Sequence, residues 1–279
     1  MQIKYGFKKE WLQFTRTFRL GGVLIAILSF AIADPLMYWG MSVLMNSLFT
    51  AGSVAGSPSD IMVETAALFD DAGMVFSLTM TDLCATSLLI IMLVLMSPCG
   101  GEQKKRATII PSCAGLDNFS YLVPKYVLYP GTVFATSFIG CCITGGLCNV
   151  MFTNGTISVG MLLLASLMSA VYMTFFTVVY MSIGLCTSRP GVVTVLMYIG
   201  VSIVQLILTS LDLTKFHPLT LRSLVTGEMF AGDFVLADNI ASILVGIALS
   251  VVIGVMMFIL TLTVQKGTKI NNQVDKPEF

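Results

Sequence analysis

Few residues of the types that carry enzyme chemistry occur in this sequence. His217 is the single histidine, so a metal-ligand cluster or a Ser/His/Asp arrangement is nearly excluded. The sequence contains no Gly-Lys pair and therefore no phosphate-binding loop of the G-x-x-x-x-G-K-[ST] type. We predict no catalytic residue, no metal site and no cofactor in this chain. His217 precedes Pro218 and is interpreted as a turn residue, with a pH-sensitive gate as the alternative.

The densest charge lies in a segment from residue 98 to residue 125. Pro98, Gly100 and Gly101 end an apolar stretch, and mixed charged and apolar residues follow until Lys125. A loop that only reverses the chain direction needs a few residues, so the segment is predicted to be a docking surface for a cytosolic partner. The alternative is that it folds back on the N-terminal helix of its own chain. The residues assigned to the partner contact are Glu102, Lys104, Lys105, Arg106, Ile109, Ile110, Leu116 and Phe119.

Two polar residues inside apolar stretches are candidates for a substrate path. A carboxyl group within a membrane usually faces a water-filled cavity or a partner. Asp82 is therefore interpreted as part of an outer vestibule or a salt-bridged gate, or else as a water-exposed helix end or a neutral, hydrogen-bonded acid. Gln205 either lines the path or bonds to a neighbouring helix. Asp34 precedes Pro35 and is predicted to mark a break in the first apolar helix.

Membrane-spanning helices must position these residues. The chain is 56% hydrophobic and 11% charged, and several stretches of about 20 residues are long enough to cross a hydrocarbon core. Backbone groups in lipid must bond internally, so continuous apolar runs indicate helices. We predict an all-α membrane protein with a single transmembrane domain over residues 1–279. Its spans are placed at 20–44, 75–97, 126–152, 160–186, 192–211 and 239–264.

The first 19 residues are predicted to form an amphipathic helix on the cytosolic membrane surface. Ile3, Phe7, Trp11, Phe14 and Phe18 recur every three or four residues, while the basic residues fall on other faces. A cleavable signal peptide is the competing interpretation, but no small-residue cleavage site follows.

The distribution of basic residues supports six spans with both termini in the cytosol. Two, Lys215 and Arg222, fall on the opposite side of the membrane, and the other thirteen share the side of the termini. Cytosolic loops carry an excess of Lys and Arg. Those thirteen are Lys4, Lys8, Lys9, Arg16, Arg19, Lys104, Lys105, Arg106, Lys125, Arg189, Lys266, Lys269 and Lys276.

Small residues are assigned to packing. Gly246, Ser250 and Gly254 recur every four residues on the sixth span, a pattern that permits close helix approach. All seven cysteines fall in predicted spans or cytosolic loops, where they are interpreted as small apolar packing residues.

This layout resembles the type-2 permeases of ATP-binding-cassette exporters in bacteria. The resemblance covers the whole chain: a helix with Lys8-Lys9-Glu10-Trp11, a first span interrupted near Asp34-Pro35, a long outer loop, and a charged cytosolic segment between spans two and three. In the commoner family pattern a Glu is followed by a few charged residues and then Gly-Thr. This chain has Glu102, a longer charged run, and Ala107 before Thr108, so the register is shifted by one.

The resemblance implies a partner ATPase and a second copy of the chain. In the family, two membrane subunits pair, and two separate subunits hydrolyse ATP with Mg²⁺ and contact the cytosolic coupling segments. The resemblance also implies an outer re-entrant helical hairpin at 212–238, between spans five and six. The expected location is the bacterial cell membrane, with several passes and cytosolic termini.

The function expected on this basis is ATP-driven export of an amphipathic or hydrophobic substrate, with peptide the preferred class. Short permeases of this shape are similar to the toxin-peptide exporters of Gram-positive bacteria. The alternatives are efflux of drugs or lipid-linked sugars, and a membrane immunity or assembly factor that binds a peptide without pumping it. Co-purification of an ATPase discriminates between pumping and mere binding.

Overall fold

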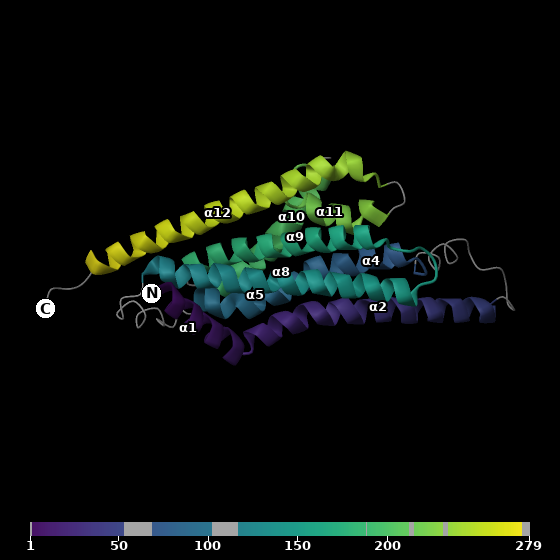
Figure 1. Cartoon of the computed structure of the whole chain (residues 1–279), viewed down its shortest axis with the longest axis horizontal. Helices are drawn as coiled ribbons and strands as arrows, with labels where there is room; N and C mark the ends of the chain where they lie inside the picture. The colour runs from purple at the N-terminus through teal and green to yellow at the C-terminus, as the bar shows by residue number, and fades with distance from the viewer. Residues whose placement is uncertain are drawn as a thin grey trace.

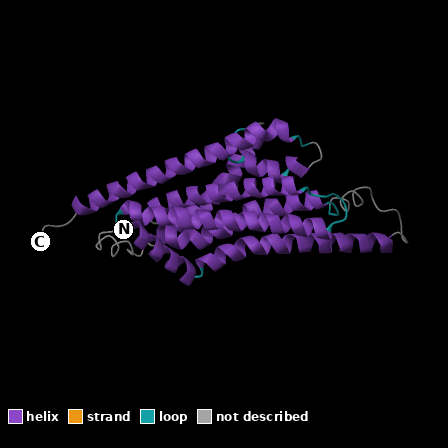
Figure 2. Cartoon of the chain, in the orientation of Figure 1, coloured by secondary structure: helices purple, strands orange, loops and turns teal. Residues whose placement is uncertain are grey.

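The chain folds as a bundle of long helices in a computed structural model that describes residues 2–52, 69–101, 117–187, 189–211, 215–230 and 234–274. Within these ranges the regular elements are all helical and no strand is present (Figure 2). Six helices are long and apolar enough to cross a membrane. The predicted all-helical class and the six spans are confirmed, and the chain is a multi-pass membrane protein.

Each predicted span corresponds to one long helix or to a continuous run of helical pieces. The second span consists of α4 (Ala72–Asp82), the π-helical turn η1 (Leu83–Ser87), α5 (Leu88–Met96) and a second π-helical turn, η2 (Ser97–Gly101). The other spans lie in α2 (Arg19–Gly52), α8 (Asn118–Met151), α9 (Val159–Cys186), α10 (Pro190–Ser210) and α12 (Leu236–Val274). A shorter helix, α1 (Gln2–Arg16), precedes them.

The predicted break at Asp34-Pro35 is wrong, because α2 continues through Pro35 to Gly52. A proline is tolerated in a membrane helix where neighbouring groups satisfy the freed backbone carbonyl. Two other boundaries also move. Helix α8 begins at Asn118, inside the segment assigned to the cytosolic loop, and α12 continues past Gln265, where a polar tail was expected. The apolar stretch gives only the minimum length of a spanning helix, and α8 and α12 both continue into polar residues beyond it.

Both termini lie at one end of the bundle, as Figure 1 shows. Helix α1 packs obliquely against α8 at this end, and the chain turns sharply into α2 at Phe18, whose φ is 58°. Helices α8 and α9 form the most extensive helix pair. Buried apolar side chains of α2, α4, α5, α8 and α9 form the core, whereas α10 and α12 expose most of their apolar side chains.

The opposite end of the bundle is held by side-chain contacts between the start of α4 and the connection from α8 to α9. Asp71 caps α4 by accepting hydrogen bonds from the backbone N–H groups of Gly73 and Met74. Asn154 donates to Asp70 at 2.7 Å, and its carbonyl accepts from the N–H of Ala72 at 2.9 Å. These bonds fix the connection between α8 and α9 against the second span.

The segment expected to form an outer hairpin contains one short helix, α11 (Thr220–Thr226), followed by the 3-10 turn η3 (Glu228–Phe230). Leu221, Leu224 and Val225 are buried, and α11 packs against α4, α9 and α12. The segment is therefore packed into the bundle, as its apolar residues require. A re-entrant hairpin of two helices stays a prediction.

The small residues of α12 make the close packing that their spacing predicts. A Cβ atom added at Gly246 would lie 3.3 Å from the carbonyl oxygen of His217 and from the side chain of Leu221. Gly254 faces Val178 of α9. Ser250 is buried and bonds to the carbonyl of Gly246. This face of α12 thus contacts α9 and the segment that contains α11.

The charge bias gives a direct test of topology. We expect cysteines introduced at Ser57 and Thr153 to react with a membrane-impermeant maleimide from outside intact cells. A cysteine at Gln103 should react only after permeabilisation, because the basic residues keep its loop in the cytosol. Each signal is measured against the labelling of the parent protein, which has its own cysteines. Outside labelling at position 103 in intact cells would contradict the predicted orientation.

Candidate functional site

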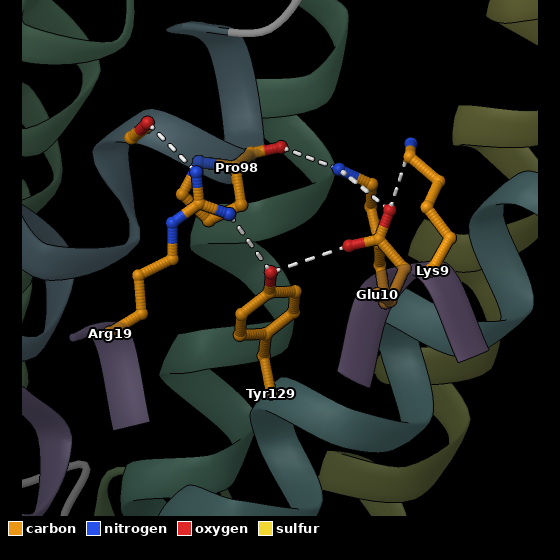
Figure 3. A network of polar contacts seen from close by, with 7 residues as sticks. Lys9, Glu10, Arg19, Pro98 and Tyr129 are labelled. Carbon is orange, nitrogen blue, oxygen red and sulfur yellow. Dashed lines mark hydrogen bonds and ion pairs between the residues drawn. The ribbon is translucent and has the colours of Figure 1, made fainter. Parts of the chain in front are cut away.

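A buried polar network lies at the end of the bundle that holds the termini (Figure 3). At its centre Lys125 of α8, with 0% of its side chain exposed, lies 3.7 Å from Oε1 of Glu10 on α1, which is 1% exposed. Lys125 also donates a hydrogen bond of 3.0 Å to the carbonyl of Pro98 in η2. One ammonium group therefore joins α1, the end of the second span and the start of the third.

Tyr129 and Arg19 extend this network to the first span. The Tyr129 hydroxyl donates to Oε2 of Glu10 at 3.3 Å, and Arg19 donates to the same hydroxyl at 3.2 Å. The second guanidinium nitrogen of Arg19 donates to Ser97 at 3.1 Å. Figure 3 shows these groups converging from α1, α2, η2 and α8. We refer to Glu10, Arg19, Ser97, Pro98, Lys125 and Tyr129 as the basal network.

The sequence of α1 explains why Glu10 is buried. Gly6, Glu10 and Phe14 are spaced by four residues and share one helix face, and all three are buried. Gly6 permits close contact with α8, since an added Cβ atom would lie 2.3 Å from the carbonyl oxygen of Ser120. Phe14 packs edge-on against the ring of Tyr129, with centroids 4.9 Å apart. Backbone contact and aromatic packing therefore hold Glu10 against α8.

Burial makes the charges of the basal network dependent on one another. Taking an ion out of water costs several kcal/mol, and only close partners with good hydrogen bonds compensate. Lys9 adds a second ammonium 3.3 Å from Glu10 but is 37% exposed. Lys9 and Lys125 also lie over the ring of Tyr121, at 4.9 Å and 4.7 Å from its centroid. The basal network thus joins α1, α2, η2 and α8 through charged groups and hydrogen bonds.

Most residues assigned to ATPase coupling lie outside the described residues: Glu102, Lys104, Lys105, Arg106, Ile109, Ile110 and Leu116. Phe119 is described and lies near the start of α8, where it is 44% exposed and 6.3 Å from the ring of Phe258 on α12. The coupling role of all eight stays a prediction. Two residues of the basal network flank the segment in the sequence, Pro98 before it and Lys125 after it.

A second polar group lies between α2 and α4, in the half of the bundle away from the termini. Asp82 accepts a hydrogen bond of 3.2 Å from the hydroxyl of Tyr38. Asp34 is one helical turn before Tyr38 on the same face of α2, and its carboxyl group is close enough to that of Asp82 for the two to interact electrostatically. Of the alternatives considered for Asp82, the one in which it is hydrogen-bonded agrees with this contact to Tyr38. Nothing in the local sequence connects Asp34, on the first span, with Asp82, on the second.

Gln205 bonds to a neighbouring helix, one of the two alternatives considered for it. Its side-chain oxygen accepts a hydrogen bond of 2.6 Å from Arg222 of α11. Arg222 is also close enough to Tyr172 and Cys84 to interact with them electrostatically. His217 accepts a hydrogen bond of 3.1 Å from the N–H of Thr220 at the start of α11, which agrees with its interpretation as a turn residue. Gln205 therefore helps to hold α11 against α10.

Comparison of the chain with known proteins gives no match. No family model, no curated protein and no solved structure matches it. Within the described ranges, no group of three or more His, Cys, Asp or Glu side chains is placed to hold a metal ion. The multi-pass membrane class rests on the six helices, and an activity has to be inferred from the polar groups between them.

Proposed function

We propose that this chain is the membrane-spanning permease subunit of an ATP-driven exporter in a bacterial cell membrane. It moves an amphipathic or hydrophobic substrate, preferentially a peptide, out of the cell. A separate ATPase subunit binds ATP and Mg²⁺, and a second copy of the chain completes the path. The resemblance in layout suggests this class.

The observation that carries the proposal is the position of the basal network around the 102–116 segment. Pro98 precedes this segment in the chain and Lys125 follows it, and the Lys125 ammonium donates a hydrogen bond of 3.0 Å to the Pro98 carbonyl. Glu10 and Arg19 connect the same point to α1 and α2. A force applied to the segment by a cytosolic partner would therefore act on the first three spans together.

The apolar surface of the spans is consistent with insertion in lipid and with pairing to a second copy of the chain. Helices α10 and α12 expose rows of apolar side chains, which lipid or a second copy would cover. Within the bundle, Asp82 and Gln205 are the polar side chains proposed for the path. At the end away from the basal network, α11 packs against α4, α9 and α12.

The proposal is tested by purifying the tagged full-length chain from its native membrane. We expect a P-loop ATPase to co-purify, and its hydrolysis to rise with substrate after reconstitution. Ile110→Asp together with Leu116→Asp should abolish both, because carboxylates would have to be desolvated in an apolar groove of the ATPase. Val150→Asp is the matched control, since Val150 is 85% exposed at the opposite end of α8.

Two results would contradict the proposal. Normal ATPase binding and stimulation by the Ile110 and Leu116 variant would remove the coupling role of the segment. Binding of a peptide by the chain, with no ATPase in any preparation, would favour a sequestering factor over an exporter.

A further inference from the structure

Asp34, Tyr38 and Asp82 form a polar cluster with an unfilled hydrogen-bonding requirement. Asp34 is 8% exposed, and its Oδ2 atom is buried with no hydrogen-bond donor in the described part of the chain. Asp82 receives one hydrogen bond, from Tyr38. Neither aspartate forms an ion pair with any described residue. The cluster therefore presents several acceptor oxygens to a single phenolic donor.

Such an arrangement is costly in a membrane unless a bound proton or another positive group completes it. Carboxyl groups within spans mark ion or substrate pathways, and they pair with a partner. Burying a polar group without a hydrogen bond destabilises the folded protein. Asp82 and Tyr38 are partly exposed, so a ligand could reach the cluster from the face between α2 and α4. The helix changes its hydrogen-bonding pattern here, because the π-helical η1 begins directly after Asp82.

The surroundings suit an ammonium group on an apolar chain better than a metal ion. Ca²⁺ takes about 6–8 oxygen ligands and Mg²⁺ about 6, whereas the cluster offers two carboxyl groups and one phenol. A primary ammonium has three N–H donors, which match the unfilled acceptors. The ring of Tyr38 is stacked on Phe69 at 5.9 Å, and aromatic faces attract organic cations. Met41, one helical turn after Tyr38 on the same face of α2, is exposed and would contact an alkyl chain.

We propose that Asp34, Tyr38 and Asp82 form a binding site for a primary ammonium group of the exported substrate. This deepens the proposed function and rests on it for the identity of the ligand. The carboxyl groups hold the charge, and Tyr38 fixes the orientation of Asp82. The substrate class is thereby narrowed to amphipathic molecules with an amine, such as lysine-containing amphipathic peptides.

The experiment measures binding of radiolabelled dodecylamine to the purified full chain in nanodiscs, with empty nanodiscs as the blank. We expect saturable binding that unlabelled dodecylamine displaces and dodecanol does not. Asp34→Asn and Asp82→Asn should each weaken the affinity by about tenfold or more, since a hydrogen bond to a charged group contributes about 1.5–3 kcal/mol. Asp238→Asn is the matched control, because Asp238 lies in the exposed first turn of α12.

A second measurement uses only the wild-type chain and so does not depend on folding of the variants. Dicyclohexylcarbodiimide activates a carboxyl group, and a bound amine then displaces the urea to form an amide. Mass spectrometry should find the dodecyl amide at Asp34 or Asp82. Amides confined to other carboxyl groups, or equal binding by the Asn variants and the wild type, would overturn the site. Displacement by NaCl but not by choline chloride would instead indicate an inorganic cation and would also overturn it.

Failure of this site can be told from failure of the proposed function, because amine binding is measured without an ATPase. Co-purification of an ATPase with no amine binding would reject the site alone. Amine binding without any ATPase would leave the site intact and reject the exporter.

Discussion

Lys125→Met is expected to lower the free energy of unfolding by about 3 kcal/mol, because it removes one partner of a buried ion pair. The variant leaves Glu10, which is 1% exposed, with Lys9 as its ammonium partner within the described residues. It also deprives the Pro98 carbonyl of the hydrogen bond from Lys125. Methionine has nearly the length of lysine, so the expected loss comes from charge and hydrogen bonding and not from a cavity. Denaturation in mild detergent, followed by intrinsic fluorescence, measures it.

Two further variants separate the ion pair from its surroundings. Glu10→Gln combined with Lys125→Met removes both charges, and the double variant should be more stable than Lys125→Met alone, because no isolated ion is left buried. Lys9→Met is the control for a half-exposed partner and should cost about 1 kcal/mol or less. The cycle is completed by Glu10→Gln alone. If the double variant loses as much free energy of unfolding as Glu10→Gln and Lys125→Met lose together, the two charges are not coupled.

The sequence predicted the spans well because hydrophobic length is a local property. Each of the six apolar stretches is helical, and the small residues of α12 contact neighbouring helices as their spacing predicts. Helix ends were less accurate. Asn118 and the residues after it are polar enough to be taken for a loop, yet Asp117 caps the helix there by accepting a hydrogen bond from the N–H of Asn118.

The polar groups between helices were harder to predict, because they join residues far apart in the chain. Lys125 was counted among the basic residues on the side of the termini, and Glu10 was noted only as part of the first helix. Nothing in their local sequence indicates that they contact each other. Tyr129 was not singled out, since a tyrosine near the end of a span is ordinary. Asp34 and Asp82 were treated separately for the same reason. A cue was present in α1, where an acidic residue shares a face with Gly6 and Phe14.

Gly6 gives the second large prediction, because it sets how closely α1 approaches α8. In Gly6→Ala the added Cβ atom would lie 2.3 Å from the backbone carbonyl oxygen of Ser120 and 3.1 Å from the ring of Pro124. Backbone cannot move aside as a flexible side chain does, so α1 must shift outward, and overpacking of this kind costs about 1–3 kcal/mol. The shift would also lengthen the contact between Glu10 and Lys125 and weaken the basal network. The first observable consequence is that α1 detaches from the bundle more often.

Limited proteolysis with trypsin measures this detachment, since Lys4 and Lys8 lie on α1 and cleavage requires local opening. We expect Gly6→Ala to be cleaved at these lysines several-fold faster than the wild type and to unfold at a lower temperature. Gly146→Ala is the matched control: Gly146 lies in α8, and nothing is within 4 Å of an added Cβ atom there. In that open position alanine should leave stability unchanged or raise it by up to about 1 kcal/mol, because alanine favours a helix over glycine. The intrinsic preference for alanine therefore acts against the predicted effect at position 6. Equal cleavage rates for Gly6→Ala and the wild type would show that α1 is not held against α8 through Gly6.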